Sequence, residues 1–282
     1  MAERIALIAG ATRGIGLALV EALAREWAGE GMVYLTARRA ADGEAEARRL
    51  TGLGLRVGWL EFDLADPGGA ARLAGELRRR HGGVDIAVQN GAYAPKDGVS
   101  TAAEAETMIA ANNHGTLRFL RAFAPLMRDD GRLIVVASGM GRLANLPAPL
   151  HERFNTFRHS PSDIDLAMDG YVAALRAGTA AAEGWPDWVN IPSKVGQVAV
   201  TRAFARQFAA DRGVLINAAC PGLTLTEATA GLMDTVFKGR SAQTPAQAAA
   251  DLLWLATLPK GTAAPYGELV QHRVVLPFGD AP

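Results

Sequence analysis

Short apolar runs alternate with amphipathic stretches along this chain. The runs are predominantly apolar, as in strands that are buried on both faces, and they are Ile5–Ala9, Met32–Thr36, Arg56–Phe62, Val84–Val88, Leu133–Ala137 and Val214–Asn217. The stretches between them have helical periodicity, and they include Gly16–Trp27, Gly69–Arg80, Thr101–Met127, Ser193–Asp211 and Pro245–Leu258. Buried strands separated by helices predict a parallel sheet covered on both faces, which is a doubly wound α/β fold.

One segment interrupts this alternation. Residues 142–188 contain four prolines and the polar stretch His159-Ser-Pro-Ser-Asp-Ile-Asp165, followed by a helix-like run at Asp165–Ala182. The rest of the chain shows no repeat and no low-complexity linker. We therefore expect a single domain over residues 1–282, in which 142–188 is an insertion outside the sheet that covers the substrate side.

Composition narrows the class of protein. The 282 residues, 49% apolar and 21% charged, suffice for one large core, and a net charge of zero argues against a nucleic-acid or anionic-membrane partner. The single cysteine, Cys220, excludes an intrachain disulfide and is consistent with a reducing compartment. No apolar run approaches membrane-spanning length, no signal peptide precedes the first strand, and the five histidines lack metal-ligand spacing. We expect a cytoplasmic protein without a metal.

A glycine-rich turn follows the first predicted strand and opens the first helix. Its sequence is Gly10-Ala-Thr-Arg-Gly14-Ile-Gly16. Glycines there let the backbone approach a pyrophosphate, whose charge faces the helix N-terminus, although an ordinary strand-to-helix turn is the alternative. The residues expected to contact the cofactor at this turn are Gly10, Thr12, Arg13, Gly14, Ile15 and Gly16.

Charge near the second strand indicates which dinucleotide binds. NAD would favour an acidic residue at the ribose, whereas this chain has Arg38-Arg39 there and Arg13 in the glycine turn. Guanidinium groups suit a 2′-phosphate, so Arg13 and Arg38 predict NADPH, with solvated surface arginines as the alternative. After the third strand, Asp63 with Leu64 is placed for the adenine, or else Asp63 caps the helix that begins near Pro67.

Together these motifs resemble the short-chain dehydrogenase/reductase superfamily over nearly the whole chain, which implies a Rossmann-like sheet. Gln89-Asn90-Gly91-Ala92 is similar to its Asn-Asn-Ala-Gly motif, and Asn112-Asn-His-Gly-Thr116 to the helix that carries its catalytic Asn. Ser138 ends the fifth strand at the position of the catalytic Ser. Cys220-Pro221-Gly222-Leu-Thr224-Leu-Thr226 resembles the loop over the nicotinamide, which implies that Pro221, Gly222, Thr224 and Thr226 bind the cofactor with Asn90 and Gly91.

Within the superfamily, the chain looks most like the carbonyl-reductase-like branch. That branch pairs an arginine after the second strand with a basic residue in the glycine turn, and it has a long insertion before the active-site helix. Here Ser138 and position 190 are 52 positions apart, more than a direct connection needs. In that branch's monomeric members the insertion covers the helix face that tetrameric relatives use, so the resemblance implies a monomer.

The same resemblance assigns Asn112, Ser138 and Lys194 to the catalytic site, but the expected Tyr is Asn190. In the family the Tyr protonates the substrate oxygen, Ser orients that oxygen, and Lys lowers the Tyr pKa and holds the nicotinamide ribose. An amide donates a hydrogen bond but gives no proton near neutral pH. Alternatively, Asn190 is the N-cap of a helix with Pro192 in its first turn.

Several other residues are candidates for the missing proton donor. Tyr93 follows the fourth strand at the ligand-binding edge, and Tyr171, His151 and His159 lie in the insertion. For each of them, packing or solvent exposure is the alternative. Trp185 and Trp188 line an apolar pocket or pack the insertion.

The sequence therefore leaves three functions as alternatives. The first is NADPH-dependent reduction of a small hydrophobic electrophile that needs little acid assistance, such as an enone C=C or a C=N bond. In the second, a carbonyl is reduced with a surrogate donor, either one of these side chains or a water linked to Lys194. The third is a non-redox protein that keeps NADPH as a structural or sensing ligand. Retention of Asn112, Ser138 and Lys194 together favours the first two.

Overall fold

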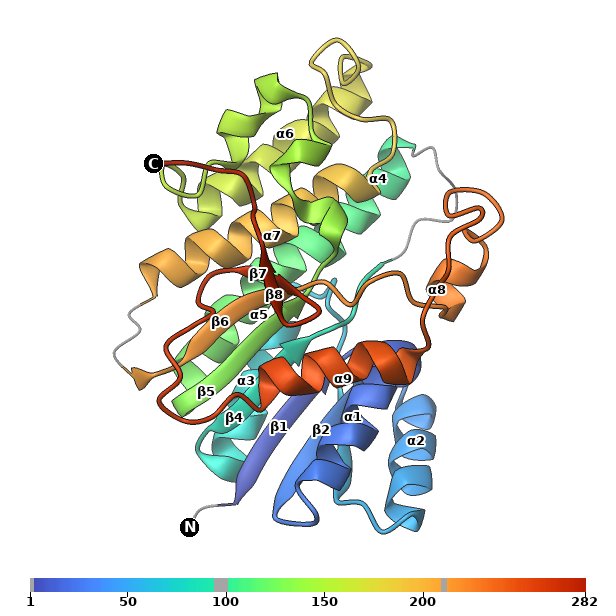
Figure 1. Ribbon diagram of the computed structural model, residues 1–282, viewed down its shortest axis with the longest axis vertical. Helices are drawn as coiled ribbons and strands as arrows, with labels where there is room; N and C mark the ends of the chain where they lie inside the picture. Colours follow the sequence, from blue (N-terminus) through green and yellow to red (C-terminus); the bar gives the residue numbers. More distant parts are fainter. Residues whose placement is uncertain (1–2, 94–100, 209–211) are drawn as a thin grey trace.

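The computed structural model describes residues 3–93, 101–208 and 212–282 (Figure 1). Its strands form one eight-stranded sheet within these residues, in the order β3-β2-β1-β4-β5-β6-β7-β8. The strands are β1 (Arg4–Ala9), β2 (Gly31–Ala37), β3 (Val57–Glu61), β4 (Val84–Gln89), β5 (Met127–Val136), β6 (Leu215–Ala219), β7 (Leu269–Gln271) and β8 (Val274–Leu276). All neighbours pair in parallel except β7 and β8. The doubly wound, Rossmann-like single domain is thereby confirmed.

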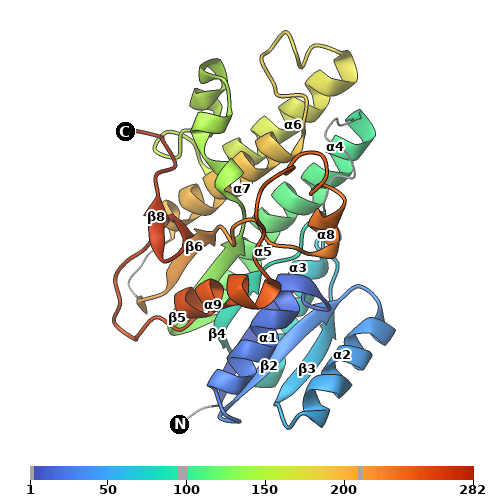
Figure 2. The same ribbon diagram turned by 45° about the vertical axis from the view of Figure 1, so that its right-hand side comes forward.

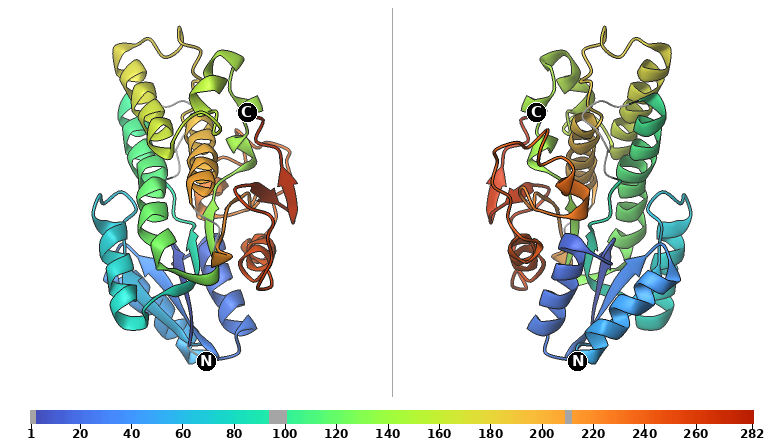
Figure 3. Two further views of the ribbon diagram at one scale, coloured as in Figure 1. Left: turned by 90° about the vertical axis from the view of Figure 1, so that its left-hand side faces the viewer. Right: turned by 90° about the vertical axis from the view of Figure 1, so that its right-hand side faces the viewer.

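Helices cover both faces of the sheet and enclose two apolar cores (Figures 1 and 3). On one face lie α1 (Gly14–Glu26), α2 (Ala40–Gly52) and α9 (Pro245–Ala256). On the other lie α3 (Gly69–His81), α5 (Gly115–Phe123) and α7 (Asn190–Gln207). Strand side chains alternate between the two cores, as Ile5 and Ala6 do, because successive residues of a strand face opposite sides. No helix in the described part of the chain is long and apolar enough to cross a membrane.

The predicted elements differ from the observed ones mainly at their ends. The long helix expected over Thr101–Met127 is interrupted: α4 (Ala102–Ile109) leads into a π-helical turn at Ala110–His114 before α5 begins. Pro125 cannot continue the hydrogen-bond ladder, so α5 ends at Phe123 and Met127 already starts β5. The predicted end of the active-site helix, Asp211, lies outside the described residues.

The insertion forms a layer beyond the end of the sheet (Figure 3). It contains two 3₁₀ segments, Leu143–Asn145 and Ala148–Phe154, and the helix α6 (Pro161–Ala177). This helix starts four residues before the predicted Asp165 because Ser160 and Asp163 form a capping box, and it stops at Gly178 rather than at Ala182. It packs against α7 and α4.

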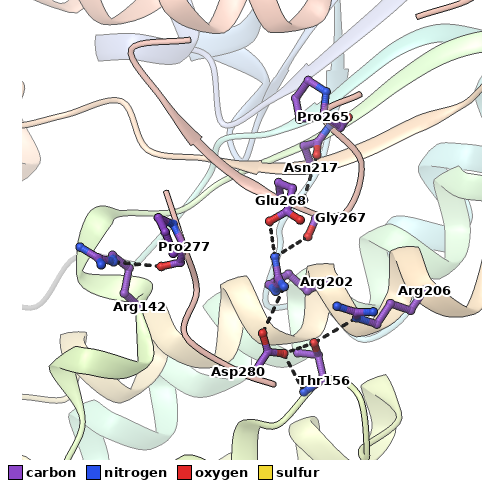
Figure 4. A network of polar contacts seen from close by, with 10 residues as sticks. All are labelled: Arg142, Thr156, Arg202, Arg206, Asn217, Pro265, Gly267, Glu268, Pro277 and Asp280. Carbon is purple, nitrogen blue, oxygen red and sulfur yellow. Dashed lines mark hydrogen bonds and ion pairs between the residues drawn. The ribbon is translucent and has the colours of Figure 1, made fainter. Parts of the chain in front are cut away.

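Residues 277–282, the C-terminal tail, connect the insertion to α7 through hydrogen bonds and an ion pair (Figure 4). Arg202 of α7 is buried and pairs with Glu268 and, at 3.1 Å, with Asp280. The same Asp280 carboxylate accepts hydrogen bonds from the backbone N–H and the hydroxyl of Thr156 in the insertion. Asn155 Nδ2 also donates to the carbonyl of Ala281 at 3.1 Å. These contacts join three segments that are far apart in the sequence.

Candidate active site

The glycine turn is held tightly against the start of the β4–α4 connection. The backbone N–H of Gly10 donates to Thr36 Oγ1 at 3.0 Å, and Asn90 Nδ2 donates to the carbonyl of Gly10 at 2.8 Å. A Cβ on Gly10 would stand 2.4 Å from the Cα of Gly91, so only glycine permits this approach. The turn therefore presents bare backbone at the N-terminus of α1.

This backbone surface fits a pyrophosphate. The first turn of α1 contains no acidic residue, and the Arg13 side chain does not cap its N–H groups. Thr12 and Ile15 are half-buried at the rim, and an added Cβ on Gly14 would lie 3.5 Å from Thr226 Cγ2. The turn thus faces the loop after β6, and Figure 2 shows the segment carrying α8 (Glu227–Ala230) above the start of α1. Helix dipole and free N–H groups make such a place suited to an anion.

Two arginines expected at the 2′-phosphate are exposed at this end of the sheet. Arg38 lines a cavity of about 490 Å³ beside β3 and α3, together with Asp63. Arg13 pairs with Glu227 at 2.7 Å, and both side chains are largely exposed. Arg39 instead binds Asp42 through both carboxylate oxygens. Arg38 is therefore exposed and makes no side-chain ion pair among the described residues, whereas Arg13 would have to exchange its Glu227 partner for a phosphate.

Asp63 does not cap the following helix. Its carboxylate accepts a hydrogen bond from the N–H of Ala65 at 2.9 Å, whereas Asp66 accepts from Gly68 just before α3. The capping alternative is wrong because α3 begins at Gly69, too far along the chain for Asp63 to reach its first N–H groups. Leu64 lies against Gly115 at the start of α5, and Asp63 is exposed.

Asn112 lies in the π-helical turn and fixes the backbone after β4. Its Oδ1 accepts from the N–H of Tyr93 at 2.7 Å, and its Nδ2 donates to the carbonyl of Tyr93 at 2.9 Å. The adjacent Asn113 exchanges hydrogen bonds with Ser193, donating to its carbonyl and accepting from its hydroxyl. The π-helical turn thus holds the β4 edge and the active-site helix α7 together.

Ser138 follows β5 and lies close to α7. Its Oγ accepts from the N–H of Met140 at 3.2 Å. Gly141 makes the close approach possible, since a Cβ there would stand 2.6 Å from the carbonyl oxygen of Lys194. Register in the sheet places Val136 beside Ala219, so the segments carrying Ser138 and Cys220 leave the sheet side by side.

The Asn190 side chain faces the turn after β5 and does not cap the helix. Asn190 is the first residue of α7, and its amide Nδ2 lies 3.9 Å from the sulfur of Met140, the residue whose N–H binds Ser138. It is 8% exposed. The capping alternative is therefore wrong: Val189 precedes the helix, and the amide points across to the Ser138 turn.

Lys194 follows Asn190 by one helical turn. Burial lowers the pKa of its ammonium to about 8, although the nearby Cys220 acts in the opposite direction. Nζ donates to Gln197 Oε1 at 2.7 Å. Neither Gln197 nor a role for Thr116, which Gln197 binds, was predicted from the sequence. The available signal was a lone amide within the apolar run after Lys194.

The loop after β6 is braced by side-chain hydrogen bonds. Cys220 Sγ accepts from the N–H of Gly139 at 2.9 Å and of Gly222 at 3.4 Å, and burial raises the pKa of this thiol. Thr224 Oγ1 donates to the carbonyl of Gly222, and Gln243 Nε2 donates to that of Pro221. Thr226 caps α8. The loop therefore lies beside Ser138 and over the glycine turn.

Most surrogate donors are engaged elsewhere. Tyr171 is fully buried against Trp185, with ring centroids 4.7 Å apart, and burial raises the pKa of its phenol. It is part of the insertion's core and is not part of a substrate wall. His151 Nε2 lies 2.8 Å from the carbonyl of Leu146, and His159 lies 4.0 Å from Glu152. Trp185 packs the insertion, whereas Tyr93 stays partly exposed near Asn112.

The chain is similar to known proteins both in sequence and in fold. The family model described as short chain dehydrogenase matches residues 4–148. Carbonyl reductase (NADPH) 3 of Rattus norvegicus is 32% identical over 97% of this chain and 98% of its own. Carbonyl reductase (NADPH) 1 of Sus scrofa is 30% identical over 99% and 96%. Among solved structures, salutaridine reductase from Papaver somniferum matches with a TM-score of 0.81 at 21% identity, over 95% of this chain and 99% of that one.

Proposed function

The chain belongs to the short-chain dehydrogenase/reductase family, and on that premise we propose that this NADPH-dependent oxidoreductase reduces activated C=C or C=N bonds of small hydrophobic substrates. One observation carries the proposal. At the first residue of α7, where the family has its acid, an amide faces the Ser138 turn across Met140. Asn190 donates a hydrogen bond there but delivers no proton.

The residues present fit NADPH. The glycine turn offers backbone N–H groups to the pyrophosphate, and Arg13 with Arg38 offers guanidinium groups to the 2′-phosphate. In this proposal Asp63 and Leu64 bind the adenine, and Asn90, Gly91 and Lys194 the nicotinamide riboside. The loop residues Pro221, Gly222, Thr224 and Thr226 then cover the nicotinamide. When bound, NADPH supplies the hydride.

The protein's own groups stabilise negative charge without a strong acid. In an enone, the β-carbon accepts hydride and the negative charge spreads over the conjugated enolate. In an iminium substrate, the carbon accepts hydride and the positive charge on nitrogen is neutralised. Ser138 and Lys194 are then sufficient as hydrogen-bond donors to the resulting enolate, and the Asn190 amide adds a third. The enolate carbon then takes its proton from water, so this second step does not require a phenol at position 190.

Reduction of a carbonyl is the second candidate, and two observations favour it. The curated relatives at about 30% identity are carbonyl reductases. In addition, a buried lysine whose pKa is lowered to about 8 releases a proton far more readily than an ordinary lysine. In this alternative Lys194, through a linked water, replaces the missing acid.

We further propose that the protein acts as a monomer in which residues 142–188 bound the substrate side. Helix α6 covers α7 and α4, and it buries Tyr171, Met168 and Ile164 beneath it. A second copy would have to displace this layer in order to pair through α7. The partner implied by the site is a small molecule.

A substrate panel separates the two candidates. NADPH consumption is measured by absorbance with cyclic enones, cyclic imines and the matching saturated ketones, and with NADH in parallel. We expect turnover of enones or imines to exceed that of the ketones at least tenfold, and Arg38→Ala to weaken NADPH binding roughly tenfold while the control Arg39→Ala does not. Preferential turnover of the ketones would instead support the surrogate acid. No consumption with any substrate, despite tight NADPH binding, would favour a non-redox role.

A further inference from the structure

A continuous chain of buried side chains runs behind Lys194. Its ammonium donates to Gln197 Oε1 at 2.7 Å, and Gln197 Nε2 donates to Thr116 Oγ1 at 3.2 Å. The Thr116 hydroxyl donates in turn to the backbone carbonyl of Asn112 at 2.5 Å. Gln197 and Thr116 are both 0% exposed. Gln197 and Thr116 therefore link Lys194, which is half-buried, to the π-helical turn through side chains that are closed to bulk water.

Only one orientation of the Gln197 amide satisfies this chain. Lys194 has donors and no acceptor, so it must meet the amide oxygen. The Thr116 hydroxyl donates its only proton to the Asn112 carbonyl, so it must accept a hydrogen bond from the amide nitrogen. Lys194 and Thr116 therefore require the same orientation of the Gln197 amide, with Oε1 toward Lys194 and Nε2 toward Thr116.

We propose that Gln197 is a positioning residue, which directs the Lys194 ammonium toward the reacting groups and favours its charged form. The role of Lys194 in catalysis rests on the proposed function. The role of Gln197 rests on the geometry alone. A buried ammonium loses hydration, and a fixed amide oxygen replaces part of it at one side. Two N–H donors of Lys194 are then left for ribose and substrate.

Such a device compensates for the missing phenol. In a site with a Tyr, lysine acts on the phenol, whereas here its neighbour one turn earlier is the neutral amide of Asn190. Lys194 must then interact with the developing negative charge directly or through water. Its charge and direction therefore matter more, and Gln197 controls both through a contact at i+3 on the same helix.

The test measures the pKa of Lys194 itself. The chain contains four lysines, so NMR titration of ¹⁵Nζ in lysine-labelled protein resolves each one, and Lys194→Met assigns the signal. Gln197→Met removes the acceptor at similar length, and we expect the pKa of Lys194 to fall. Gln197→Glu keeps the acceptor and adds negative charge, which should raise that pKa by about one pH unit or more.

A matched control comes from the same helix. Thr201 is buried and donates to the backbone carbonyl of Gln197, so Thr201→Val removes a buried hydroxyl without touching Lys194. It should leave the pKa of Lys194 unchanged. If Gln197→Met does not fold, Thr116→Val is the second variant. It removes the acceptor of Gln197 Nε2, so the amide is no longer fixed, and the pKa of Lys194 should fall as in Gln197→Met.

Kinetics provide a second readout. In single-turnover hydride transfer, the pH midpoint should move with the NMR value in each variant, whereas a purely structural defect would lower the rate at every pH. The inference is overturned if Gln197→Met and Gln197→Glu leave the pKa of Lys194 unchanged. If the pKa values move as expected but no substrate is turned over, the positioning role stands and the proposed function fails.

Discussion

At the scale of single residues, the site combines an amide and an amine where a phenol and an amine are expected. Asn190 and Lys194 lie one turn apart on α7. The Asn190 amide faces Met140, and the backbone carbonyl of Lys194 lies against Gly141, in the turn that follows Ser138. The amide carries no charge at any physiological pH, so the electrostatics of the pocket depend on Lys194. Because the pKa of that lysine is lowered to about 8, its charge changes within the working pH range of most enzymes.

Restoring the phenol tests this arrangement. Asn190→Tyr places an acid one turn from Lys194, and we expect reduction of saturated ketones to rise at least tenfold, since general acids contribute roughly 10²- to 10⁴-fold. The measurement is kcat/KM for a saturated ketone and for an enone. The gain should be largest for the ketone, whose oxygen needs the proton.

Asn190→Phe is the matched control, since it brings the same ring without the hydroxyl. Asn190 is 8% exposed and faces Met140, so either ring must displace that side chain. Equal ketone activity in the Tyr and Phe variants would show that the ring, and not the acid, is responsible. It would contradict the expectation that an acid at position 190 lies within reach of the substrate oxygen.

At the scale of elements, the π-helical turn Ala110–His114 joins three parts of the molecule. Asn112 binds the backbone of Tyr93 after β4, Asn113 binds Ser193 in α7, and His114 binds two carboxylates of α6. A π-helical turn carries one extra residue per turn, which lets three consecutive side chains reach three different elements. The turn therefore positions the site and the insertion together.

His114 makes the attachment of the insertion depend on pH. Its Nδ1 lies 2.8 Å from Asp165 and its Nε2 lies 3.0 Å from Asp169, and only the protonated ring donates at both nitrogens. The hydrogen bond to Asp165 raises the pKa of His114, while burial and Arg118 lower it less than the carboxylates raise it. The folded pKa thus exceeds the unfolded value. Stabilisation is complete below the unfolded pKa and is lost as pH rises through the folded one.

We therefore expect His114→Gln to lower the free energy of unfolding by roughly 1–3 kcal/mol near pH 6, and by less as the pH rises above the folded pKa. Urea titrations of both proteins across this range give the difference directly. His159→Gln, in the same insertion but 4.0 Å from Glu152, is the control and should have a small effect at every pH. If the difference in unfolding free energy between the two proteins grew with pH, protonated His114 would not be what stabilises the contact with Asp165 and Asp169.

Local sequence patterns predicted the sheet, because buried strands and glycine turns have local signatures. The glycine turn lies between β1 and α1, where those patterns placed it. Ser138 and Lys194, which the family resemblance singled out, lie directly after β5 and in α7. The strands β7 and β8 were missed because three residues each are too few to show periodicity. The π-helical turn was missed since its cause is tertiary: the hydrogen bonds of Asn112 and Asn113 to distant segments. Gln197 was missed for the same reason, because the orientation of its amide depends on a hydrogen bond to Thr116, 81 positions away.

At the scale of the whole molecule, the last residues of the chain are structural. Chain termini usually tolerate change, yet the Asp280 side chain is 1% exposed and binds Arg202 and Thr156 (Figure 4). The Arg202 side chain is 7% exposed and also binds Glu268, so water replaces a lost partner poorly there. The insertion, α7 and the tail are thereby stabilised as one unit.

Removing this carboxylate should therefore be costly. We expect Asp280→Ala to lower the free energy of unfolding by roughly 1.5–3 kcal/mol, because buried Arg202 keeps only Glu268 as a charged partner and the N–H of Thr156 loses its acceptor. Urea unfolding measures the loss, and limited proteolysis should show cleavage within residues 142–188 before the rest of the domain. Asp129→Ala is the control, since Asp129 is 77% exposed in its pair with Arg212 and should cost less than about 1 kcal/mol. Equal effects of the two substitutions would show that the tail is an ordinary terminus and does not hold the insertion.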